Sequence, residues 1–120
     1  MIVERTRWHP IRDARIAALA EGAVMRVMLK NTPIVLVRDQ GALYAFADRC
    51  PHQGKPLSGG WVDDGHLVCP YHRFHFKLEN GHARHGVCSH ATVYEVKATE
   101  DGCAIGMPYT TFRIFGFDLW

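Results

Sequence analysis

The sequence predicts an all-β fold, and three observations support this class. Short runs rich in Val, Ile, Leu, Tyr and Phe recur between residues 23 and 47, with Asn or Gly between them. Strand-like alternation returns near residue 91, after a long segment without clear periodicity. No segment carries a sustained helical stripe of apolar residues.

The first run of elements reads as a β meander. Three strands are predicted at residues 23–29 (AVMRVML), 33–39 (PIVLVRD) and 43–47 (LYAFA). The connections KNT and QGA contain the residues that tight turns favour. Before them, residues 14–20 (ARIAALA) are the best helical candidate, although a loop with a single helical turn fits them equally well.

The middle of the chain, from about residue 48 to 88, has the composition of functional loops. Glycine and proline are frequent there, and six of the eight histidines fall between His52 and His85. We therefore predict one domain of residues 1–120, in which residues 48–88 are inserted as loops with a short hairpin.

The C-terminal part returns to strands and ends in an aromatic tail. Residues 91–100 (ATVYEVKATE) and 103–107 (CAIGM) are predicted strands on either side of a turn. The tail, residues 108–120 (PYTTFRIFGFDLW), is expected to fold back as an extra strand, and a partner or self-association surface is the alternative.

Composition excludes several classes of function. Hydrophobic residues make up 48% of the chain and charged residues 22%, which is ordinary for a globular protein. A net charge of +2 without a basic run argues against nucleic-acid binding. Charges close to the apolar stretch near Ile16 argue against a signal peptide or a membrane span, so we expect a soluble cytoplasmic protein.

Two short pairs of metal-ligand residues carry the chemistry. Cys50 and His52 form a C-x-H pair, and Cys69 and His72 form a C-x-x-H pair, with sixteen residues between the pairs. Thiolate and imidazole ligands suit zinc or iron rather than magnesium or calcium. The residues alone leave two readings open, a structural zinc site with four ligands and a 2Fe-2S cluster with two cysteines on one iron and two histidines on the other.

The stretch CPHQGKPLSGGWVDDGHLVCPYH resembles the signature of the Rieske 2Fe-2S domain family. The resemblance extends from about Val24 to Met107 and implies a small antiparallel β-barrel or sandwich. It implies one 2Fe-2S cluster per chain, with Cys50 and Cys69 on the inner iron and His52 and His72 on the outer iron.

The resemblance also implies a function. Members of the ferredoxin branch carry single electrons from a flavin-containing NAD(P)H-dependent reductase to a terminal Rieske oxygenase, commonly one that acts on aromatic compounds. By this resemblance the chain is an electron carrier in the cytoplasm and not an enzyme by itself. The alternatives are the Rieske-like small subunit of an NAD(P)H nitrite reductase and the N-terminal Rieske component of an oxygenase.

Departures from the high-potential members of the family indicate the same branch. Those members have a serine and a tyrosine whose hydroxyls donate to sulfur, and Phe74 and Phe76 occupy these positions here. Gly54 and Tyr71 stand where those members have a disulfide. The potential is therefore expected near the lower end of the Rieske range, about −150 mV.

Several other residues near the motif are interpreted as non-ligands. We expect solvated side chains, not ligands, at His66, His75, His82 and His85, and Cys88 and Cys103 are interpreted as plain thiols. Arg73 stands where the family usually has glycine, so either the loop differs or Arg73 is held in a strained conformation.

Overall fold

The chain forms two antiparallel β-sheets, which confirms the predicted class. The computed structural model describes residues 2–51, 53–86, 89–114 and 117–118. The larger sheet has the order β1-β9-β8-β4-β3-β2 with β10 added to β9, and the smaller sheet has the order β5-β6-β7. The strands are β1 Ile2–Arg12, β2 Val24–Leu29, β3 Thr32–Asp39, β4 Ala42–Ala47, β5 Trp61–Asp63, β6 His66–Val68, β7 His75–Lys77, β8 Val93–Thr99, β9 Gly102–Ile114 and β10 Phe117–Asp118.

Two-residue turns close both hairpins of the meander and the first hairpin of the small sheet. Lys30 and Asn31 join β2 to β3, with φ of 47° and 67°. The β3–β4 turn, at Gln40 and Gly41, and the β5–β6 turn also have positive φ at both central residues. Consecutive positive φ values define the type I′ turn, whose twist matches that of the flanking strands.

Strand β3 is buried on both faces and separates two hydrophobic cores. Ile34 and Leu36 belong to one core, which also contains Ile16, Cys103 and Ile105. Val35 and Val37 point the other way, into a core shared with the inserted segment. All four side chains of the run from Ile34 to Val37 are 0% exposed. This explains why the sequence there is a continuous apolar run rather than an alternating one.

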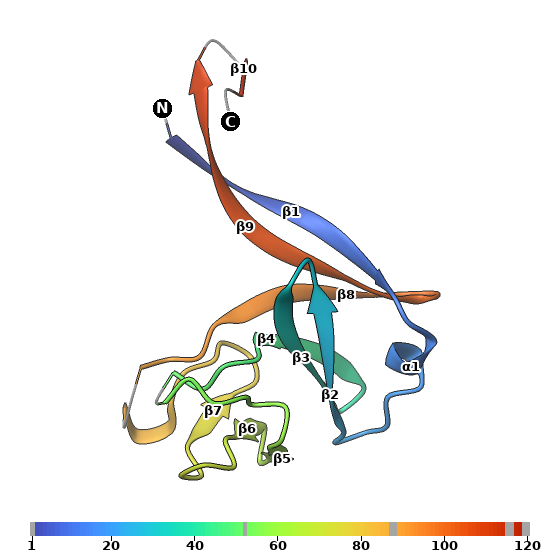
Figure 1. Cartoon of the computed structure of the whole chain (residues 1–120), viewed down its shortest axis with the longest axis vertical. Coiled ribbons are helices and arrows are strands. Elements are labelled where there is room, and N and C mark those ends of the chain that lie inside the picture. The colour runs from blue at the N-terminus through green and yellow to red at the C-terminus, as the bar shows by residue number, and fades with distance from the viewer. Residues whose placement is uncertain (1, 52, 87–88, 115–116, 119–120) are drawn as a thin grey trace.

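The inserted segment occupies one end of the molecule. In Figure 1 the green-to-yellow segment lies beneath the meander, whereas the start of β1 and strand β10 lie at the opposite end of the long axis. The sequence predicted a short hairpin in this segment, and the structure has the three-stranded sheet of β5, β6 and β7 instead. The short 3-10 helix η1, Arg84–Gly86, follows it.

The two ends of the chain pair with one another along a long ribbon. Strand β1, which the sequence did not reveal, pairs with β9 from Ile2 opposite Phe112 to Arg12 opposite Gly102. The ribbon extends away from the rest of the fold (Figure 1). Residues 108–114 of the tail thus continue β9 rather than starting a new strand, and β10 then folds back on β9. Residues 115–116 and 119–120 of the tail lie outside the described residues.

Within the described residues, a single short α helix covers the core that contains Ile34 and Leu36. Helix α1, Ala14–Ala17, is one turn long and begins after Asp13, whose side chain accepts a hydrogen bond from Arg15 N. Its anchor is Ile16, which is 1% exposed. No helix in the described part of the chain is long and apolar enough to cross a membrane.

The β3–β4 turn depends on an ionised carboxylate, which gives a pH-dependent prediction. Backbone N–H groups of Gly41 (2.9 Å) and Gln40 donate to Glu21, and these bonds lower the pKa of that carboxyl. A lowered pKa contributes stability above the pKa of the unfolded chain, and this contribution is lost as the pH falls through the lower folded value. Glu21→Ala should therefore lower the thermal midpoint at pH 7 and change it little well below pH 4. Glu100→Ala, at an exposed turn position, is the control and should have little effect at either pH. A Glu21→Ala deficit of equal size in acid would contradict the assignment.

Candidate metal centre

Two loops with the same backbone hydrogen bonds hold the two cysteines. In the first loop, residues 50–55, Cys50 N donates to Lys55 O (2.7 Å) and Gly54 N donates to Cys50 O (2.7 Å). In the second loop, residues 69–74, Cys69 N donates to Phe74 O and Arg73 N donates to Cys69 O, both at 2.9 Å. Each cysteine is thus fixed through both its amide and its carbonyl by bonds inside its own loop.

The fifth residue of each loop has a left-handed backbone. Gly54 has φ of +71° and Arg73 has φ of +57°. Glycine adopts this conformation readily, whereas a side chain makes it unfavourable by about 1 kcal/mol or more. Of the two interpretations for Arg73, the structure thus supports the strained one, because its loop keeps the backbone that glycine provides in the first loop.

Both cysteine side chains are buried in the core beneath the inserted segment. Cys50 is 1% exposed and Cys69 is 2% exposed, and both belong to the cluster that includes Val35, Val37 and Phe46. Neither sulfur is in a disulfide. Cys103 lies in the other core, where burial raises the pKa of its thiol. The three described cysteines therefore divide into a pair in one core and a separate thiol beyond β3, while Cys88 lies outside the described residues.

The histidine side of the site faces solvent. His72 is exposed, and its ring lies 6.1 Å from that of Phe74. The side chain of Tyr71 is 46% exposed, and Lys55 Nζ lies 5.6 Å from the centre of its ring, so this contact links the two loops. His52 lies outside the described residues.

The aromatic residues that replace hydroxyl donors line the buried side of the site. Phe76, on β7, is 0% exposed in the same cluster as Cys50 and Cys69, and Phe74 packs against that cluster. A phenyl ring carries no hydrogen-bond donor, whereas a serine or tyrosine hydroxyl can donate to a sulfur atom. The two positions therefore contribute apolar surface to the site.

A buried carboxylate anchors the first loop to the meander. Asp48 Oδ1 accepts a hydrogen bond from Ser58 N (2.7 Å), and Asp48 N donates to Pro33 O (3.0 Å). Asp48 Oδ2 has no hydrogen bond but lies 3.5 Å from Arg26 Nε, which makes the contact an ion pair without hydrogen-bond geometry. Asp48 and Ser58 flank the first loop, and the contacts of Asp48 tie this loop to β2 and β3. Sequence reasoning missed Asp48, since nothing local distinguishes it from a solvated acid.

The other histidines lie in distinct surroundings. His66 Nδ1 is 2.6 Å from Asp64 O and 3.3 Å from Arg84 Nη2. His75 is half-buried, and its Nδ1 has no hydrogen-bond partner. His82 and His90 stack with ring centres 4.1 Å apart, and His85 is exposed with φ of +62°. That His66, His75, His82 and His85 are not metal ligands stays a prediction from the sequence.

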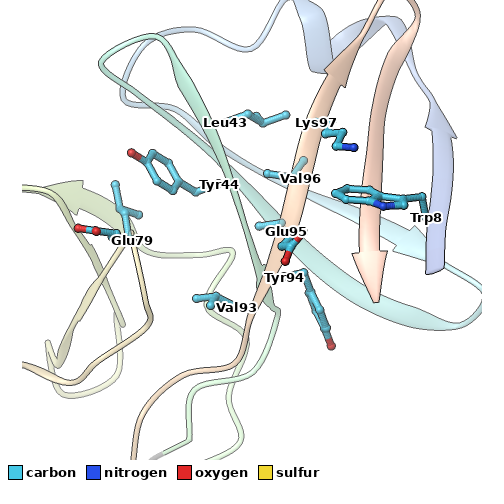
Figure 2. A pocket seen from close by; sticks show the side chains of 11 residues that line it. Trp8, Leu43, Tyr44, Glu79, Val93, Tyr94, Glu95, Val96 and Lys97 are labelled. Carbon is cyan, nitrogen blue, oxygen red and sulfur yellow. The ribbon is translucent and has the colours of Figure 1, made fainter. Parts of the chain in front are cut away.

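A separate hollow lies between the meander and the start of β8. It has a volume of about 580 Å³, and Figure 2 shows Tyr44 and Glu79 on one side of it and Trp8 beside Lys97 on the other. Lys97 Nζ lies 4.0 Å from the centre of the Trp8 ring. The lining includes no residue of the two cysteine loops. This hollow therefore takes no part in the candidate metal centre.

The donor atoms that the two loops provide fit a thiolate and imidazole metal group. Two buried sulfurs come from equivalent loops, and an exposed imidazole follows the second sulfur. In apolar surroundings two thiolates without a counter-charge are costly, because a buried charge needs a partner. A bound metal supplies that partner. Among the described residues, which leave out His52 and Cys88, no three His, Cys, Asp or Glu side chains group as ligands of one ion.

The fold and the paired loops define a metal-binding β protein, and a comparison of sequences identifies its family. Residues 8–99 match the Rieske [2Fe-2S] domain family, so the chain belongs to that family. The Rieske [2Fe-2S] domain binds a 2Fe-2S cluster. This confirms the family and the cofactor that the sequence predicted.

Known proteins with this domain differ in size and role. The chain is 50% identical over 54 residues to the 4beta-methylsterol monooxygenase of Methylococcus capsulatus, which covers 44% of this chain but only 15% of that protein. A chain of the complex of reduced oxygenase and oxidised ferredoxin in carbazole 1,9a-dioxygenase is 26% identical, with a TM-score of 0.70 over 82% of this chain and 91% of that one. A crystal structure described as a putative NADH-dependent nitrite reductase small subunit from Mycobacterium tuberculosis is 21% identical and shares the fold, with a TM-score of 0.73 over 86% of this chain and 96% of that one.

The equivalent loops give a matched pair of stability predictions. Arg73→Gly removes the left-handed strain of a side chain but gives the unfolded chain more freedom, so it should stabilise the protein by up to about 1 kcal/mol. Gly54→Ala should destabilise it by about 1 kcal/mol or more. A new Cβ at residue 54 would also lie 3.3 Å from Arg49 Nη2. Thermal unfolding of the cluster-loaded variants, followed by circular dichroism, measures both. Equal shifts of the same sign would contradict the equivalence of the loops.

Proposed function

We propose that this chain is a one-electron carrier that accepts electrons from a flavin-containing NAD(P)H-dependent reductase and passes them to a terminal oxygenase acting on aromatic compounds. The observation that carries the proposal is the pair of equivalent loops, each burying one cysteine while His72 faces solvent. A group held in this way is insulated on one side and accessible on the other, as exchange of electrons between proteins requires.

The proposed ligands are Cys50 and Cys69 on one iron and His52 and His72 on the other. When bound, a 2Fe-2S cluster takes up and releases one electron. The chain's own part is to fix the sulfur ligands through the loop hydrogen bonds, to exclude water with the apolar core, and to present the His72 side to a partner. Phe74 and Phe76 give no hydroxyl to the sulfur atoms, which favours a potential near the low end of the Rieske range, about −150 mV.

The similarity to a chain of the carbazole dioxygenase complex supports a carrier. This chain spans 15% of the sterol monooxygenase, whereas it covers 91% of the matched chain from the carbazole dioxygenase complex, whose description names an oxidised ferredoxin. We place the carrier in the cytoplasm as part of the same proposal, because NAD(P)H-dependent reductases work there and Cys50, Cys69 and Cys103 are not in disulfides.

A second candidate is the small subunit of an NADH-dependent nitrite reductase. The shared fold with the Mycobacterium tuberculosis protein, over 96% of that chain, favours it. The two candidates differ in the lifetime of their complexes, because a carrier exchanges partners and a subunit stays bound. Steady-state reduction of excess cytochrome c by NADH, with catalytic amounts of this protein and a ferredoxin reductase, would favour the carrier.

Cluster binding is tested with the protein purified without air. We expect about two irons per chain, and a rhombic electron paramagnetic resonance signal after dithionite reduction, as a cluster with two histidine ligands gives. Cys50→Ala and Cys69→Ala should abolish the signal. Cys103→Ala is the matched control, because Cys103 is equally buried but lies in the other core, and it should keep both iron and signal. About one zinc per chain and no signal would overturn the proposal.

The low potential is tested by restoring a hydroxyl at a buried position. Phe76→Tyr adds a donor inside the core that holds Cys50 and Cys69. A hydrogen bond to a sulfur stabilises the more negative, reduced form. A net gain of about 1 kcal/mol raises a one-electron potential by roughly 40 mV. Protein-film voltammetry measures the shift. An intact cluster with an unchanged or lowered potential would contradict the role given to Phe76.

A further inference from the structure

The two cysteine loops and the residue that precedes them carry three exposed cations. Arg49 lies just before Cys50, Lys55 ends the first loop, and Arg73 is the fifth residue of the second loop. All three side chains are exposed, as are Tyr71 and His72 between them in the chain. We call Arg49, Lys55, Tyr71 and Arg73 the loop surface.

Contacts within the loops hold these cations at the surface of the site. The guanidinium of Arg49 lies against Gly54, since a Cβ there would be 3.3 Å from Nη2. Lys55 of the first loop lies over the ring of Tyr71 in the second, at 5.6 Å. Arg73 is fixed at its backbone by the hydrogen bond to Cys69 O. The backbone hydrogen bonds that position Cys50 and Cys69 therefore also position Lys55 and Arg73.

No carboxylate neutralises this charge within the described part of the chain. None of Arg49, Lys55 and Arg73 forms an ion pair there, whereas Arg26 and Arg84 elsewhere do. The sequence has no acidic residue between Asp48 and Asp63 or between Asp64 and Glu79. Asp48 is turned inward, where it binds Ser58 N and Arg26. The chain as a whole has a net charge of only +2, so the local excess is a property of this surface.

We propose that the loop surface docks a redox partner protein through an acidic patch on that partner. The inference rests on the proposed function and adds the charge of the partner's docking face. Lys55 lies over the half-exposed ring of Tyr71, which supplies an apolar contact beside the cations of the two loops. Complementary charge speeds encounter and fixes orientation more than it adds affinity.

The test uses two protein oxidants of opposite charge, acidic plastocyanin and basic cytochrome c. One electron leaves the reduced cluster and converts Cu²⁺ to Cu⁺ in plastocyanin or Fe³⁺ to Fe²⁺ in cytochrome c. Stopped-flow rates are measured at ionic strengths from about 0.01 M to about 0.15 M, over which the Debye length falls from about 30 Å to about 8 Å. The variants are Lys55→Glu and Arg73→Glu. Arg12→Glu is the control, because it makes the same change in net charge beside Asp101, outside the inserted segment.

With plastocyanin, the rate should fall as salt is added, and Lys55→Glu and Arg73→Glu should each slow the reaction about tenfold at low salt. With cytochrome c, the rate should rise with salt and the same variants should speed the reaction. Arg12→Glu should change either rate by less than about twofold. Rates that do not depend on salt, or an effect of Arg12→Glu as large as that of Lys55→Glu, would overturn the docking inference while leaving electron transfer intact. A protein without a reducible cluster would overturn the proposed function and this inference together.

Discussion

The site depends on one constraint, that strand β3 must be buried on both of its faces. Ile34 and Leu36 close the core of the larger sheet, and Val35 and Val37 form the floor on which the inserted segment packs. Since successive side chains of a strand point to opposite faces, a single short strand serves both cores only when every residue in it is apolar. Polar substitution at any of these positions would expose or leave unsatisfied a group inside one of the cores.

Hydrogen bonds and one ion pair hold the two cysteine loops in place above this apolar surface. Each loop closes on itself through two backbone hydrogen bonds, and Asp48 ties the region to β2 and β3. Cys50 and Cys69 then lie in a dry, apolar environment while the loop tips face solvent. One side of the centre is thus insulated and the other is accessible. Arg73 keeps the left-handed backbone of the second loop, although glycine would adopt it with less strain.

Patterns local in the sequence predicted their elements well. The three strands of the meander and their turns were found because hydrophobic runs and turn residues lie next to one another in the chain. Strand β1 was missed because it lies at the edge of the sheet, where Pro10 and several charged residues are tolerated and no clear alternation is needed. The tail was separated too early from the strand before it, because only pairing with β1 extends β9 to Ile114.

The class of fold, the family and the four candidate ligands could be predicted from the sequence, because ligand types at fixed spacing reflect local loop chemistry. The three-dimensional structure was needed to show that the two loops are equivalent in backbone, that Arg73 occupies a glycine-like conformation and that Asp48 is an internal anchor. Tertiary contacts also place Lys55 of the first loop over Tyr71 of the second, and turn Asp48 inward toward Arg26 and Ser58. These features depend on contacts between residues far apart in the chain, which no local pattern records.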